Sequence, residues 1–130
     1  MKFGYCIFYV DSVEATLAFF EKAFHFSRRF LHESGTYGEL DTGETVLAFA
    51  SHDMGDANLS GDYVRTSSDG KPFGMELAFV AEDVSAAYAG ALACGASRVA
   101  EPKPKPWGQI VGYVRSPDGI LIELCTPVSG

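Results

Sequence analysis

A weak internal repeat constrains this chain more than any other feature, because the same order of strand and helix patterns occurs twice. In each half, an apolar strand-like run precedes an amphipathic helical pattern, and three further strand-like segments follow. The first half comprises the segments 3–10, 11–24, 27–33, 37–41 and 45–50, and the second half the segments 75–80, 83–94, 97–100, 109–115 and 120–125. The sequence therefore predicts an α+β protein made of two tandem β-α-β-β-β units.

Local signals agree with this segmentation. Residues 11–14 have the D-x-x-E form of a capping box at the start of the first predicted helix. Gly95 follows the second helical pattern, where a capping glycine commonly ends a helix. Between the halves, residues 51–73 are polar and rich in glycine, so we interpret them as a long connection or lid.

The composition is that of one ordinary globular domain, residues 1–130, with units at about 1–50 and 74–127. A chain of 130 residues that is 47% hydrophobic and 21% charged can bury a stable core without disulfide cross-links. Its three cysteines, Cys6, Cys94 and Cys125, are an odd number without C-x-x-C spacing. This pattern argues against a disulfide framework or a zinc knuckle and favours a reducing compartment.

Charge and hydropathy exclude several classes of partner. The net charge of -7 argues against binding to nucleic acid or anionic lipid, both of which need a basic surface. Asp11 and Glu14 interrupt the apolar run at residues 1–10, so we do not expect a signal peptide. No run approaches the roughly 18 apolar residues of a membrane span. We therefore expect a cytoplasmic protein with no nucleic-acid or membrane partner.

Two glutamates in apolar strand-like segments are the strongest indication of a site. Glu76 lies in the run Gly74–Val80 and Glu123 in the run Gly119–Leu124. A carboxylate in a buried strand is costly unless it is paired, bound to a metal or exposed to a wet cavity. The alternative is that each glutamate lies on the solvent face of a half-exposed strand.

Three stretches of sequence, together with the repeat, carry a family resemblance. They are VDSVEATLAFFEKAFHF at 10–26, EDVSAAYAGALACGA at 82–96, and the ending formed by WG at 107–108 and SPDGILIEL at 116–124. Together they resemble the vicinal oxygen chelate superfamily, which includes glyoxalase I, extradiol dioxygenases, fosfomycin resistance enzymes and bleomycin resistance proteins. The resemblance implies a cup-shaped, mostly antiparallel sheet with helices on its outer face. It is much less specific for function.

The resemblance also implies where the metal-dependent members place their ligands, at one position on the first strand and one on the last strand of each unit. Aligning the two halves assigns these positions to Tyr5, Ala48, Glu76 and Glu123. Two carboxylates without a histidine make a poor transition-metal site, so no metal and no cofactor is expected. The histidines fall outside these positions, and only His32, on a predicted strand, is a candidate for the cavity.

Loss of the metal ligands from a retained fold is the condition of the bleomycin resistance proteins. The resemblance therefore implies a homodimer that sequesters an aromatic, often cationic small molecule without turning it over. Strand alternation and aromatic content select the expected contact residues, and Trp107 follows a proline-rich segment that should hold the indole at a rim. The predicted ligand-binding set is Tyr5, Ile7, Tyr9, His32, Tyr37, Glu39, Ala48, Tyr63, Glu76, Trp107 and Glu123.

Two other functions stay open. A divergent metal-dependent enzyme, such as a glyoxalase-like lyase or isomerase or a dioxygenase, would use Glu76 and Glu123 with a third ligand from the connection, such as His52, Asp53 or Asp56. A scaffold or partner-binding domain would have an occluded cavity. Each strand aromatic could also be an ordinary core residue.

Overall fold

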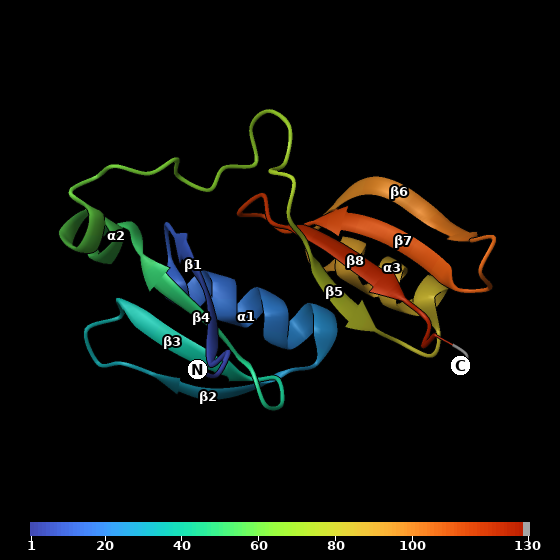
Figure 1. Ribbon diagram of the computed structural model, residues 1–130, viewed down its shortest axis with the longest axis horizontal. Helices are drawn as coiled ribbons and strands as arrows, with labels where there is room; N and C mark the ends of the chain where they lie inside the picture. The colour runs from blue at the N-terminus through green and yellow to red at the C-terminus, as the bar shows by residue number, and fades with distance from the viewer. Residues whose placement is uncertain (129–130) are drawn as a thin grey trace. The chain divides into compact units, whose positions relative to one another are not determined.

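A computed structural model describes residues 1–128 of the chain (Figure 1). The chain divides into two compact units, Met1–Thr66 (unit 1) and Ser67–Gly130 (unit 2), and each is considered by itself. Each unit holds one four-stranded sheet in which the first strand pairs in parallel with the last, and the other pairs are antiparallel. The predicted α+β fold of tandem β-α-β-β-β units is confirmed.

Unit 1 contains β1 (Tyr5–Val10), α1 (Val13–Phe24), β2 (Ser27–Leu31), β3 (Tyr37–Asp41), β4 (Val46–Ser51) and α2 (His52–Leu59). Its sheet has the order β1-β4-β3-β2, and α1 packs against one face of it. Unit 2 contains β5 (Leu77–Val80), α3 (Val84–Ala93), β6 (Ser97–Pro104), β7 (Ile110–Arg115) and β8 (Leu121–Cys125), with the matching order β5-β8-β7-β6.

The core of each unit lies between its helix and its sheet. In unit 1, Leu17 and Phe20 of α1 and Leu40 and Phe49 of the sheet are fully buried. The corresponding core residues of unit 2 include Val114, Ile122 and Leu124. Since side chains alternate between the two faces of a strand, the other face of each sheet is left open by the helix.

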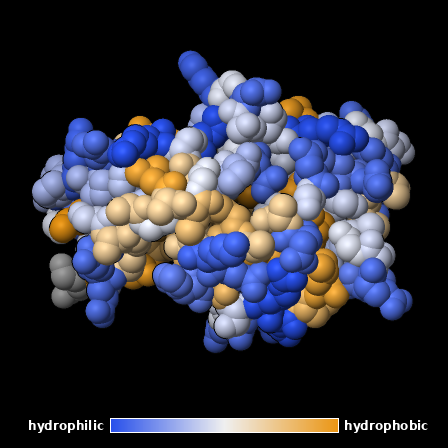
Figure 2. Space-filling view, turned by 180° about the vertical axis from the view of Figure 1, so that it is seen from behind, coloured by the Kyte–Doolittle hydropathy of each residue, from blue (hydrophilic) through white to orange (hydrophobic). Residues whose placement is uncertain are grey.

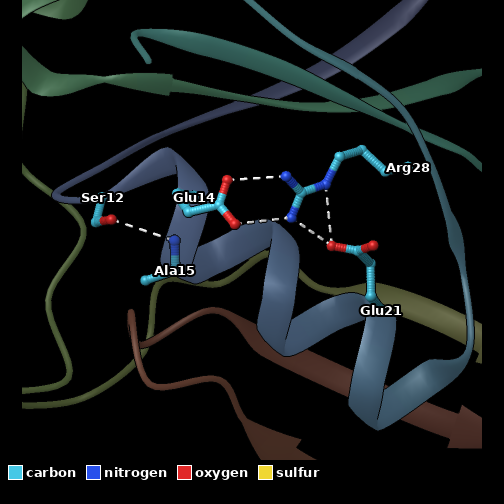
Figure 3. Close-up of polar contacts among 5 residues, drawn as sticks. All are labelled: Ser12, Glu14, Ala15, Glu21 and Arg28. Atoms are coloured by element: carbon cyan, nitrogen blue, oxygen red, sulfur yellow. Dashed lines mark hydrogen bonds and ion pairs between the residues drawn. The ribbon is translucent and has the colours of Figure 1, made fainter.

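Helix α1 begins differently from the expectation. The N-cap is Ser12, whose hydroxyl oxygen accepts a hydrogen bond from the Ala15 amide at 3.2 Å (Figure 3). The predicted capping box of Asp11 and Glu14 is wrong, because the Glu14 carboxylate is bound by Arg28 of β2 at 2.8 and 3.1 Å. Arg28 also donates to Glu21 at 2.6 and 3.1 Å, so one guanidinium ties β2 to both ends of the helix (Figure 3).

The predicted connection contains a helix that the sequence analysis missed. Helix α2 follows β4 directly, with Ser51 as its N-cap, and it buries only His52 and Gly55. Its residues include a glycine and form no apolar face, so it lacks the periodicity that indicates a helix. The unit boundary falls inside the predicted connection, between Thr66 and Ser67.

Each unit anchors its own end of the connection. In unit 1, the Thr66 hydroxyl donates to the backbone oxygen of Tyr9 at 2.6 Å. In unit 2, the Arg115 guanidinium donates to the backbone oxygens of Ser67 and Gly70 at 2.9 and 2.7 Å. A Cβ atom at Gly119 would overlap the Ser67 backbone, so this close approach depends on glycine. Within residues 1–128, no helix has the length and apolar character needed to span a membrane.

Candidate functional site

The open face of the unit 1 sheet carries most of the predicted ligand-binding residues. Cross-strand pairing places Ile7 beside Ala48, Ala48 beside Glu39, and Glu39 beside Phe30. The neighbouring row places Tyr9 and Tyr37 on either side of Ala50. Tyr5 and Ile7 are 57% and 46% exposed, as expected for strand residues that point away from the helix. We call this surface, formed by Tyr5, Ile7, Tyr9, Phe30, Tyr37, Glu39 and Ala48, the unit 1 face.

Glu39 is the buried carboxylate of the unit 1 face, and it is 7% exposed. Its oxygens accept a hydrogen bond from the Tyr37 hydroxyl at 2.7 Å and lie 3.7 Å from Nε of Arg29. Burial, followed by the hydrogen bond to Glu39, raises the pKa of Tyr37 well above its ordinary range. The negative charge of Glu39 is thus balanced by Arg29 of the same unit.

The pairing of β2 with β3 explains how Arg29 reaches Glu39. The pairing of β2 with β3 shifts between Arg28 and Phe30, so Arg29 is the extra residue of the bulge. Arg28 is directed to the helix, where it binds Glu14 and Glu21, whereas Arg29 contacts the carboxylate on the open face. Two adjacent arginines thus serve opposite faces of the same sheet.

The matching surface of unit 2 carries a different arrangement. Ala78 pairs with Glu123, and Glu123 pairs with Tyr113. The Tyr113 hydroxyl donates to Oε1 of Glu123 at 2.7 Å. This hydrogen bond, with burial and the negative charges nearby, raises the pKa of Tyr113 to about 12. We call the surface formed by Glu76, Ala78, Val80, Tyr113, Leu121, Glu123 and Cys125 the unit 2 face.

Glu76 completes a carboxylate pair on the unit 2 face. It directly precedes β5 and is exposed, so the expectation that it lies within a buried strand is wrong. Partial burial of its carboxyl group, the charge of Glu123 and a hydrogen bond with Glu123 together raise the pKa of Glu76. Burial and the hydrogen bond with Glu123 likewise raise the pKa of the Cys125 thiol.

Unlike Glu39, this carboxylate pair has no cation. Within residues 1–128, neither Glu76 nor Glu123 forms an ion pair. The bulge residue of β6 that corresponds to Arg29 is Val99, since the pairing of β6 with β7 shifts between Arg98 and Ala100. The side chain of Arg115 is occupied by backbone oxygens at Ser67, Gly70 and Gly119.

Tyr9 and Tyr63 are engaged in a cluster with His52. The ring of Tyr63 lies 5.2 Å from that of Tyr9 and 5.9 Å from that of His52. The Tyr63 hydroxyl and Nδ1 of His52 are 2.7 Å apart. Nε2 of His52 is 3.4 Å from a carboxylate oxygen of Asp11, at an angle that does not make a hydrogen bond. These contacts hold the connection against β1.

His32 and Trp107 occupy turns. The prediction that His32 lies on a strand is wrong, because β2 ends at Leu31. Within the β2–β3 turn, Nδ1 of His32 and the Ser34 hydroxyl form a hydrogen bond of 2.7 Å. Trp107 lies in the β6–β7 turn and is 63% exposed, and its Nε1 donates to Oε1 of Gln109 at 2.7 Å. An edge of the indole is thus fixed while much of its surface meets solvent, and its binding role stays a prediction.

Sequence reasoning missed Arg29 and Tyr113. A signal for Tyr113 exists: the turn over residues 116–119 fixes the register of β7 and β8, which places Tyr113 opposite Glu123. The contact of Arg29 with Glu39 depends on how β2 pairs with β3, which the alternation along one strand does not fix.

The fold and site identify the class of protein as one built from two β-α-β-β-β units with open sheet faces. A family model described as the Glyoxalase/Bleomycin resistance protein/Dioxygenase superfamily matches residues 2–124. The chain belongs to this superfamily. Comparison with the curated proteins gives no match.

Solved structures support the same fold. A glyoxalase/bleomycin resistance protein/dioxygenase family enzyme from Burkholderia phytofirmans PsJN is 19% identical, with a TM-score of 0.83 over 99% of this chain and 100% of that chain. A glyoxalase-related enzyme from Fulvimarina pelagi is 20% identical, with a TM-score of 0.82 over 98% of this chain and 88% of that chain. TioX from Micromonospora sp. ML1 is 19% identical, with a TM-score of 0.70 over 97% and 98% of the two chains. At such identities the similarity shows the fold alone.

Taken unit by unit, the positions that the resemblance assigns to metal ligands do not fit a transition metal. Unit 1 has Tyr5 and Ala48 there, and the alanine side chain has no donor atom, while unit 2 has Glu76 and Glu123. Across the described residues, no group of three or more His, Cys, Asp or Glu side chains could hold a metal ion. The donor set thus falls short of the three or four ligands that such metals take from a protein.

Proposed function

We propose that this protein binds a small aromatic or cationic molecule without chemically changing it, in the manner of the bleomycin resistance proteins of its superfamily. The observation that carries the proposal is the carboxylate pair of Glu76 and Glu123, which has no cation among residues 1–128. Two neighbouring carboxylates without a cationic partner favour a positively charged ligand. The net charge of -7 favours its approach.

Exposed apolar side chains support a ligand with an aromatic or apolar body. Figure 2 shows orange, hydrophobic residues reaching the surface among blue, hydrophilic ones. The exposed large apolar residues include Tyr5, Ile7 and Phe30 on the unit 1 face, Val80 on the unit 2 face, and Trp107. Aromatic rings of this kind stack on flat ligands and attract cations.

The same exposed surfaces support a homodimer, because monomers rarely leave large apolar patches open to solvent. We place the dimer in the cytoplasm, where it would sequester its ligand. Light scattering should give about twice the 14.0 kDa chain mass. A clean monomer at micromolar concentration contradicts this part of the proposal.

Fluorescence of the single tryptophan tests binding directly. Planar cationic antibiotics such as bleomycin should quench Trp107 emission saturably, and mass spectrometry should recover the ligand unchanged. Elemental analysis of the purified protein should find no stoichiometric zinc, nickel, iron or manganese. Conversion of the ligand, or a stoichiometric metal whose removal lowers the melting temperature, would overturn the proposal in favour of a metal-dependent enzyme.

A further inference from the structure

Tyr63 of the connection fits into the surface of unit 1 by both its ring and its hydroxyl. The ring lies 5.2 Å from that of Tyr9 and 5.9 Å from that of His52, and it stacks on the imidazole with an interplanar angle of 22°. The hydroxyl and Nδ1 of His52 are 2.7 Å apart. A Cβ atom at Gly55 would lie 2.5 Å from this hydroxyl, so glycine leaves the room that the hydroxyl fills. We call the surroundings of Tyr63, formed by Tyr9, His52 and Gly55, the phenol site.

The polar end of the phenol site is buried. His52 is 5% exposed, and its Nε2 has no hydrogen-bond partner within residues 1–128. The Tyr63 hydroxyl therefore satisfies the one nitrogen of this imidazole that is hydrogen-bonded. An aromatic ring without a hydroxyl would leave both nitrogens unpaired, and an unpaired buried polar atom is costly. The phenol site thus favours a ring that carries a hydroxyl over the same ring without one.

The segment that carries Tyr63, residues 60–66, is held to unit 1 at few points, and we call it the strap. All of its residues are exposed except Tyr63 and Thr66, which are half-buried. The Thr66 hydroxyl donates to the backbone oxygen of Tyr9 at 2.6 Å. The other side-chain link is the exposed ion pair of Arg65 with Asp56, of a kind that contributes little to stability.

The backbone at the start of the strap is also unfavourable. Ser60 has a φ of 54°, in the left-handed region that a serine seldom adopts, and Gly61 follows with a φ of 71°. Segments with few buried contacts detach from a folded protein at a much lower free energy than the core. We therefore expect the strap to open while the helix and sheet of unit 1 stay folded.

A ligand that uses Tyr9 has to displace Tyr63. Tyr9 belongs to the unit 1 face, and the ring of Tyr63 lies against it. Where only a fraction of the protein is free to bind, the apparent affinity for a ligand falls by that fraction. An external phenol can repeat the stacking and the hydrogen bond that Tyr63 makes, so it can replace Tyr63 without leaving Nδ1 of His52 unpaired.

We infer that the strap is a displaceable cover of the unit 1 face, in which Tyr63 acts as an internal ligand that gives way to a phenol ring of an external ligand. This inference rests on the proposed binding function and specifies a chemical group of its ligand. The incoming ring stacks on Tyr9 and His52, and its hydroxyl takes over the hydrogen bond to Nδ1.

Two probes test the inference on the full-length protein: p-cresol, which is the side chain of tyrosine as a free molecule, and toluene, which lacks only the hydroxyl. Trypsin cleaves after Arg65, within the strap, so the rate of this cleavage reports its detachment. We expect p-cresol to accelerate the cleavage saturably, at a concentration about 10-fold lower than toluene requires, the factor that corresponds to one hydrogen bond. Cleavage after Arg98, on β6 of unit 2, should not change. No acceleration at Arg65, or an equal effect of toluene, overturns the inference.

Variants of the strap locate the effect. Tyr63→Ala removes the internal ligand and should bind p-cresol about 10-fold or more tightly than the wild-type protein, as measured by NMR titration of the His52 ring signals. Val64→Ala is the matched control, since Val64 is 74% exposed in the same strap and should leave the affinity unchanged. Gly55→Ala, added to Tyr63→Ala, should abolish the gain by filling the space of the hydroxyl. Equal affinity of Tyr63→Ala and the wild-type protein overturns the inference and makes Tyr63 a structural anchor. If Tyr63→Ala does not fold, the cleavage of the wild-type protein decides alone.

Quenching of Trp107 emission by bleomycin separates this inference from the proposed function. If bleomycin quenches the emission but p-cresol does not open the strap, only the inference is lost. If neither effect occurs, the proposed function fails as well.

Discussion

The two units place a tyrosine–carboxylate hydrogen bond on the same kind of open sheet face, but they build it from different positions, within one strand in unit 1 and across two strands in unit 2. In unit 1, Glu39 lies on the third strand opposite Ala48, whereas in unit 2 Tyr113 holds that position opposite Glu123. Both hydrogen bonds are 2.7 Å long. The backbone positions are thus repeated, while the charge has moved to the neighbouring strand.

The residue at the bulge of the edge strand differs in charge between the two units. The bulge residue is Arg29 in unit 1 and Val99 in unit 2. Arg29 contacts Glu39, whereas Val99 offers no charge. The comparison teaches that the two units differ by one side chain at this position: unit 1 supplies a cation for its buried carboxylate, and unit 2 has none there for its acidic pair.

The largest expected effect is on ligand affinity, from substitution of Trp107 in the β6–β7 turn of unit 2. The corresponding β2–β3 turn of unit 1, residues 32–36, has no Trp, Tyr or Phe. If this turn makes unit 2 the ligand platform, Trp107→Ala should weaken binding of planar cationic antibiotics about 5- to 150-fold, equivalent to about 1–3 kcal/mol of stacking. The melting temperature should barely move, since the indole is 63% exposed. Calorimetric titration and thermal melts measure the two quantities. Unfolding of the variant, with unchanged ligand affinity in whatever remains folded, would assign Trp107 to structure instead.

Arg29→Val tests the bulge directly by giving unit 1 the residue type of unit 2. Glu39 is 7% exposed and would lose its cation, so the free energy of unfolding should fall by about 1–2 kcal/mol, reduced from the value for a fully buried pair because Arg29 is half-exposed. Denaturant titration gives the measurement. Arg65→Met is the matched control, since it breaks an exposed ion pair with Asp56 and should cost about 0.5 kcal/mol or less. Equal losses in the two variants would mean that Glu39 does not depend on Arg29.

The sequence allowed the strands and the two long helices to be predicted because their apolar residues recur at strand or helix spacing over whole elements. It failed where structure depends on contacts between elements. Helix α2 has no apolar face, and the glutamate of the supposed capping box is taken by Arg28. For the candidate site, the sequence indicated Glu76 and Glu123 as charges in apolar runs, and their binding role stays a prediction. The contact of Arg29 with Glu39 was missed because it depends on the pairing of two strands, which the residue pattern does not fix.

The guanidinium of Arg28 offers a second contrast between the units. Arg28 pairs with Leu40, and Arg98 pairs with Val114 at the matching position of unit 2, but α3 contains no acidic residue to receive it. We therefore expect Arg28→Met to lower the melting temperature, because it removes the hydrogen bonds to Glu14 and Glu21, and Arg98→Met to leave it nearly unchanged. Thermal unfolding of both variants makes the comparison. If the melting temperature of Arg28→Met falls no further than that of Arg98→Met, the network in Figure 3 contributes nothing measurable to stability.

The smallest expected effect is a pair of opposite pH dependences from one glutamate in each unit. The hydrogen bond from Arg28 holds the pKa of Glu14 below its ordinary value, so its contribution to stability is present above the unfolded-state pKa and is lost as the pH falls through the folded-state pKa. Glu76 has a raised pKa, since burial and the neighbouring Glu123 disfavour its charge. The folded state then retains the proton longer than the unfolded state, and stability falls as the pH rises from the ordinary pKa of glutamate through the raised one.

Two neutral variants separate these dependences. Glu14→Gln should remove the loss of stability on the acid side, and Glu76→Gln should remove the decline on the alkaline side of the ordinary glutamate pKa. NMR titration of the two carboxyl groups, with denaturant unfolding at several pH values, measures both. A bound cationic ligand beside Glu76 should lower its pKa, because the cation favours the charged form. An ordinary pKa for Glu76 in the free protein would mean that Glu123 does not act on it, and the contrast between a compensated unit 1 and an acidic unit 2 would then rest on Arg29 alone.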